Sequence, residues 1–91
     1  MLGRVMAVFR VREWLAAQVR CEADQLDLVG RPRPTARGQE GRYELLSGDL
    51  ASVLITWAAP AGGDRGRRMV IATLPEGGAV HDVDAADRVE W

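Results

Sequence analysis

The sequence predicts an α+β domain in which one N-terminal helix packs on an antiparallel sheet of four to five strands. Three observations lead to this prediction. Apolar residues recur at helical spacing over residues 12–25, an apolar and β-branched run covers 50–59, and a second such run covers 67–75. With 91 residues the chain has the size of one small domain, so we expect residues 1–91 to share a single core.

The N-terminal segment allows two interpretations. Residues 4–11 alternate between apolar and other side chains and include β-branched and aromatic residues, which indicates a strand. From Val11 onward the apolar residues recur at helical spacing instead. One long helix over 4–25 is the alternative, because no capping residue separates the two patterns. Arg12 would interrupt the apolar stripe of that long helix, so we favour a strand followed by a helix over 12–25.

The rest of the chain predicts a series of strands. Residues 42–47 (RYELLS) form a short strand, and 50–59 form a buried central strand with Trp57 in the core. A glycine-rich loop over 60–67 leads to the antiparallel partner strand, 67–75. The acidic C-terminal segment is then expected to form an edge strand or two short pieces, since charged residues protect exposed edges.

The stretch GRPRPTARGQEGR, residues 30–42, is compositionally the most unusual. Its prolines and glycines argue against a central strand or helix, so we expect an extended loop. Four arginines and one glutamate give it a charge of +3, and three further arginines lie in residues 65–68. If the two basic loops converge, they form one binding patch. The candidate binding residues are Arg31, Arg33, Arg37, Arg42, Arg65, Arg67, Arg68 and Trp91.

Composition weakens the meaning of these arginines. All twelve basic residues are arginine and none is lysine, which favours a GC-rich, bacterial genome over a dedicated arginine-rich motif. The net charge is −1, so no overall field attracts nucleic acid. Aromatic residues make up only 5% of the chain, and acidic segments flank both basic loops. For Trp91 two roles stay open: packing back on the sheet, or serving an interface.

No motif of useful specificity indicates catalysis or a metal site. Cys21 and His81 are the only residues of their kinds, and no nucleophile motif or phosphate-binding loop occurs. His81, Asp82, Asp84 and Asp87 offer metal-ligating atoms, but a strand would turn His81 away from Asp82 and Asp84. We therefore expect no enzymatic activity, no metal and no cofactor.

The expected function is a small non-enzymatic protein interaction module that forms a homodimer, of the accessory, regulatory, immunity or phage type. The alternative is a nucleic-acid-binding domain that uses loops 30–42 and 62–68. No apolar run approaches the roughly 20 residues that cross a bilayer, so we expect no membrane partner. A single cysteine fits a reducing interior, which predicts a cytoplasmic location.

Overall fold

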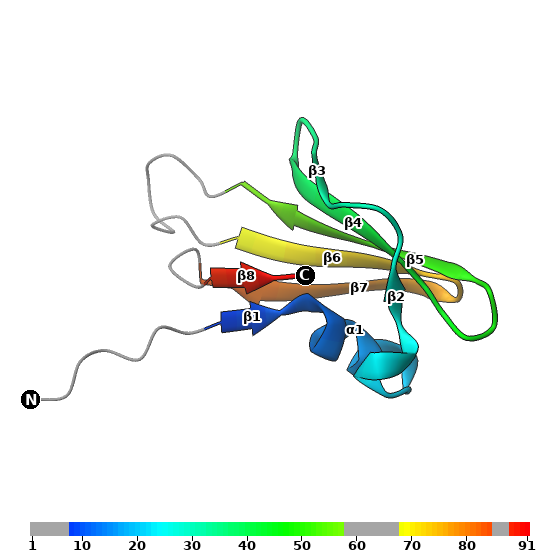
Figure 1. Ribbon diagram of the computed structural model, residues 1–91. Helices are drawn as coiled ribbons and strands as arrows, with labels where there is room; N and C mark the ends of the chain where they lie inside the picture. The colour runs from blue at the N-terminus through cyan, green and yellow to red at the C-terminus, as the bar shows by residue number, and fades with distance from the viewer. Residues whose placement is uncertain (1–7, 58–67, 85–87) are drawn as a thin grey trace, which may run out of the picture.

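A mostly antiparallel sheet, one short helix and a separate pair of strands make up the fold, which confirms the α+β class (Figure 1). The structure is a computed structural model and describes residues 8–57, 68–84 and 88–91. Along the chain the elements are β1 Val8–Arg10, α1 Val11–Val19, a 3-10 helix Ala23–Gln25, β2 Asp27–Leu28, β3 Arg33–Pro34, β4 Gly38–Glu44, β5 Leu50–Thr56, β6 Arg68–Leu74, β7 Gly77–Val83 and β8 Arg88–Glu90.

The main sheet has the strand order β2-β4-β5-β6-β7, and β3 also pairs with β4. Strands β4 to β7 form a meander in which neighbours in sequence are neighbours in space, as predicted. The predicted count of four to five strands is too low, because the sheet has six strands and β3 adds two residues from the region interpreted as loop. The parallel pairing of β1 with β8 was not predicted, since periodicity carries no information about partners so distant in sequence.

Within the described residues a strand, Val8–Arg10, is followed directly by a helix, so the single long helix over residues 4–25 is wrong; residues 4–7 of the predicted strand lie outside the described residues. Helix α1 is shorter than predicted because Arg20 adopts a left-handed conformation with φ 59° and ψ 52°. The N–H groups of Arg20 and Cys21 both donate to the carbonyl of Ala16, which closes the helix end. Glycine is the usual residue at such a position, so the sequence gives no sign of this end. Among the described residues no helix is long and apolar enough to cross a membrane.

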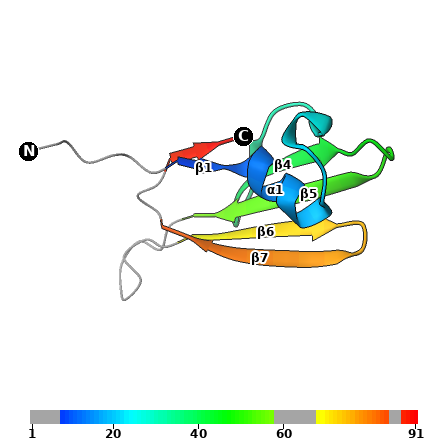
Figure 2. The same ribbon diagram turned by 90° about the horizontal axis from the view of Figure 1, so that it is seen from below.

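The core lies on one face of the sheet, under α1 (Figure 2). Leu15 of α1 and Leu26 after the 3-10 helix are fully buried, and each burial contributes about 2 kcal/mol. On the sheet, alternate residues point into this core and their neighbours point to the opposite face. The buried sheet residues are Tyr43, Ala51, Val53, Ile55, Val70, Ala72 and Val83.

Two glycines of β4 permit close approach, which corrects the prediction that this region could not be a strand. A Cβ atom at Gly38 would lie 2.0 Å from the carbonyl oxygen of Ile55 in the neighbouring strand. A Cβ at Gly41 would lie 2.9 Å from the indole ring of Trp91. In these positions glycine makes room for a neighbouring strand and for a packed tryptophan.

We expect Gly38→Ala to lower the free energy of unfolding by at least about 2 kcal/mol, because backbone atoms of β5 would have to move. Gly78→Ala in β7 is the matched control, since its new Cβ would lie in ordinary contact, 3.6 Å from the carbonyl oxygen of Ala72. Urea unfolding of both variants measures the difference. Equal stabilities would contradict the close approach at Gly38.

Candidate binding surfaces

The predicted basic loop is a hairpin made by β3 and β4. Thr35 closes its turn: the Thr35 hydroxyl oxygen accepts hydrogen bonds from the backbone N–H groups of Arg37 and Gly38, both at 3.1 Å. Arg33 lies opposite Glu40 across the hairpin, and Arg42 lies opposite Ser52 of β5. All four predicted arginines of this segment are exposed: Arg31, Arg33, Arg37 and Arg42.

Only part of the second basic loop falls within the described residues. Arg65 and Arg67 lie outside them, whereas Arg68 is the first residue of β6 and is partly buried. The register pairs Ile55 with Val70, so two residues further along β5 Trp57 lies level with Arg68. On its other side the Trp57 N–H donates to the carbonyl of Arg37 at 3.0 Å. Arg37 and Arg68 therefore approach the same end of the sheet, from strands on either side of Trp57.

Trp57 is exposed, and its prediction as a core residue is wrong. Its side chain is 54% exposed, and it lies one residue beyond the last residue of β5. The indole N–H donates to the carbonyl of Thr35 at 3.3 Å, which ties one edge of the ring to the hairpin turn. The apolar run over residues 50–59 indicated a buried strand, but the core does not extend along β5 as far as Trp57.

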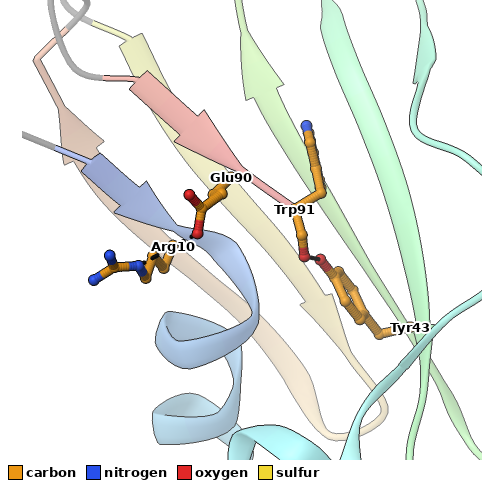
Figure 3. Close-up of polar contacts among 4 residues, drawn as sticks. All are labelled: Arg10, Tyr43, Glu90 and Trp91. Atoms are coloured by element: carbon orange, nitrogen blue, oxygen red, sulfur yellow. Dashed lines mark hydrogen bonds and ion pairs between the residues drawn. The ribbon is translucent and has the colours of Figure 1, made fainter.

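Trp91 packs back on the covered face of the sheet (Figure 3). Its ring lies against Gly41, and its indole N–H donates to the side-chain oxygen of Gln39 at 3.2 Å. The hydroxyl of Tyr43 donates to the main-chain oxygen of Trp91. Nearby, Arg10 of β1 and Glu90 of β8 form an exposed ion pair at 3.3 Å. The ring is still partly exposed, so a role of Trp91 in binding a partner stays a prediction.

The opposite face of the sheet carries a band without charged side chains. On β5 and β6 the residues that point to this face are Leu50, Ser52, Leu54, Thr56, Met69, Ile71 and Thr73. A cross-strand row runs from Leu54 through Ile71 to Val80 of β7. Of these side chains Val80 is 60% exposed, Leu50 49% and Met69 41%. Charged residues of β4 and β7, such as Arg42 and Asp82, border the band on its two sides.

The single histidine lies beside two aromatic rings on the covered side of β7. His81 stacks on Phe9 with ring centroids 5.8 Å apart, and Trp14 lies 6.1 Å from it. His81 points to the covered side of β7 and Asp82 to the other, as the strand alternation predicted. Within residues 8–57, 68–84 and 88–91 no three His, Cys, Asp or Glu side chains gather to hold a metal ion; Asp87 lies outside these ranges.

A shallow cleft of about 580 Å³ lies between the end of α1 and the turns that follow β4 and β6. Arg20, Asp49 and Glu76 line it together with apolar side chains such as Leu45 and Leu74. Its one positive and two negative groups favour no single charge of ligand. The cleft lies at the end of the sheet opposite Trp57, because β5 runs from Leu50 to Thr56 between the two ends.

Comparison of the chain with protein-family models, curated proteins and solved structures finds no match in any of the three. Functional inference therefore depends on two exposed surfaces: the uncharged band on β5 and β6, and the hairpin of β3 and β4 with Trp57 beside it. Sequence reasoning named the arginines of the hairpin as candidate binding residues but missed the uncharged band and the exposure of Trp57. The band could have been found from the sequence, because both faces of the 50–59 and 67–75 runs are apolar. The exposure of Trp57 could have been inferred from its position just before the predicted loop over 60–67, which contains proline and glycine.

The burial of the Tyr43 hydroxyl predicts a stability change at high pH. Burial raises the pKa of Tyr43 from 10.0 to about 12, and the positive charge of Arg12 opposes this with a smaller lowering. A pKa raised by folding means that stability is complete below pH 10 and is lost as the pH rises toward 12. We expect the free energy of unfolding to fall by about 2 kcal/mol over that interval.

Because Tyr43 is the only tyrosine, phenolate absorbance reports its titration directly. Tyr43→Phe is the control: it should remove this pH dependence and cost about 1 kcal/mol at neutral pH through the lost hydrogen bond. Titration of Tyr43 at its ordinary value in the folded protein would contradict the buried contact.

Proposed function

We propose that this chain is a non-enzymatic interaction module that self-associates through the uncovered face of its sheet. A second copy of the chain is the occupant of that face. The single observation that supports this is the uncharged band on β5 and β6, bordered by charged residues on β4 and β7. An apolar centre with a polar rim is the usual anatomy of a protein interface.

The pattern of the band suits two-fold packing of sheet on sheet. Sheets that pack face to face keep their strands nearly aligned. A two-fold axis that runs parallel to the strands over β6 puts β6 of one copy on β6 of the other and β5 on β7. The apolar row Leu54, Ile71 and Val80 then meets its own copy near the axis. Such a surface is self-complementary, as a symmetric dimer requires.

The small core gives a second reason for association. A domain of this size buries a low fraction of its surface, and one nine-residue helix covers one face of its sheet. Packing of a second copy would bury Val80, Met69 and Leu50, which are all more than 40% exposed. We also propose a cytoplasmic location, because Cys21 is the single cysteine of the chain and forms no disulfide within it.

The test is the mass of the protein in solution, measured by size-exclusion chromatography with light scattering over a dilution series. We expect a dimer whose dissociation constant rises at least about tenfold in Val80→Glu and in Met69→Glu, because each would bury an unpaired charge in the interface. Both positions are exposed in the single chain, so the monomer should remain folded.

Leu46→Glu is the matched control. Leu46 is 77% exposed but lies in the turn between β4 and β5, away from the band, so its replacement should leave the mass unchanged. A wild-type chain that is monomeric at the highest soluble concentration would overturn the proposal. So would a dimer that all three variants weaken equally.

A further inference from the structure

Trp57 and the hairpin beside it form a second exposed surface, one that the dimer does not use. The ring of Trp57 is more than half exposed, although exposed tryptophans are unusual in a small domain. Its indole N–H is bonded to Thr35 and its backbone N–H to Arg37. The two bonds hold the ring in one place while a large part of its surface stays open to solvent.

The hairpin beside this ring carries three exposed arginines. The carbonyl of Arg37 accepts the backbone N–H of Trp57, and Arg31 and Arg33 are exposed on the connection and the strand that precede it. Arg33 lies on the uncovered face of the sheet, whereas Trp57 follows Ile55 on the covered face. Glu40 is the one acidic residue of the segment, and it lies opposite Arg33. The local charge is therefore positive although the net charge of the chain is −1.

The acidic segments that flank this region in sequence lie away from it in space. Strand β4 leads from Gly38, beside Trp57, to Glu44, six residues away, which is about 20 Å in a strand. Asp27 pairs with Glu44, and Asp49 lies in the turn beyond. Among the described residues, Asp82 and Asp84 of the β7 segment are the acidic residues at the Trp57 end of β6 and β7, two strands across from Trp57. A polyanion is thus favoured on the β3–β4 side of the ring.

We propose that this surface binds single-stranded nucleic acid, with one base stacked on Trp57, a neighbouring phosphate paired with Arg37, and Arg31 and Arg33 adding positive charge along the hairpin. An open indole face offers a base the stacking that gives sequence-tolerant affinity, and arginines beside it neutralise the backbone. A duplex cannot use the site in this way because its bases are already stacked. An acidic peptide would use the arginines but would gain nothing from the indole ring.

The test is fluorescence anisotropy with labelled oligothymidylate and oligouridylate at low and moderate salt, in wild-type protein and three variants. Trp57→Ala should weaken binding about tenfold, whereas Trp57→Phe, which keeps an aromatic face, should retain most of the affinity. The double variant Arg33→Gln, Arg37→Gln should weaken binding and lower the salt slope by about 1.4, because each neutralised phosphate of a single strand contributes about 0.7. Saturable quenching of tryptophan fluorescence by the oligonucleotides should accompany binding in the wild type.

Arg20→Gln is the matched control, since Arg20 is also exposed but lies at the other end of the sheet, and its loss should change the affinity little. Circular dichroism of each variant establishes that it is folded. Absence of binding to either oligonucleotide at low salt would overturn the proposal. Binding that Trp57→Ala leaves unchanged and that polyglutamate displaces as well as an oligonucleotide would also overturn it, and would identify a site for acidic protein segments.

Discussion

The fold depends on a covering layer that is smaller than the sheet beneath it. Helix α1 has nine residues and is about 14 Å long, whereas the four intervals between β2 and β7 span about 19 Å. The layer is completed by β1, β8 and the ring of Trp91, which packs where Gly41 leaves room. Everything that this layer does not reach stays exposed: the second face of the sheet, and the end of β5 at Trp57. Both proposed surfaces are exposed because the covering layer is smaller than the sheet.

The alternating direction of the strands determines at which end of the sheet each charged connection lies. Because each strand of the meander reverses the previous one, successive connections fall at alternate ends of the sheet. Arg37 and Arg68 lie at one end, and Asp49 and Glu76 in turns at the other. Alternating blocks of charge in the sequence thus become two ends of different character. Acidic segments flank both basic loops in the sequence, but the antiparallel topology places Asp49 and Glu76 at the end of the sheet opposite Arg37, and Asp82 and Asp84 beside Arg68.

The sequence predicted what local patterns can carry. The α+β class, the strand–helix order at the N-terminus and the three strands β5, β6 and β7 follow from periodicity. Three features escaped. The end of α1 at Arg20 has no glycine to mark it, and β3 and β4 run through prolines and glycines that argue against strands. The exposure of Trp57 depends on how far a distant layer reaches, which no local pattern encodes.

The parallel pairing of β1 with β8 has a consequence for the order of folding. It joins Val8 to Arg88, which are 80 positions apart, whereas the meander joins strands only a turn away from one another. Closing so long a loop costs conformational entropy. Favourable contacts offset this cost only when the folded meander already offers β1 and β8 a surface to pack on. The β1–β8 pairing should therefore form last during folding and open first. When it opens, the ring of Trp91 should also lose its contact with Gly41. Amide hydrogens of β8 should therefore exchange faster than those of β5, through a local opening that leaves the meander folded.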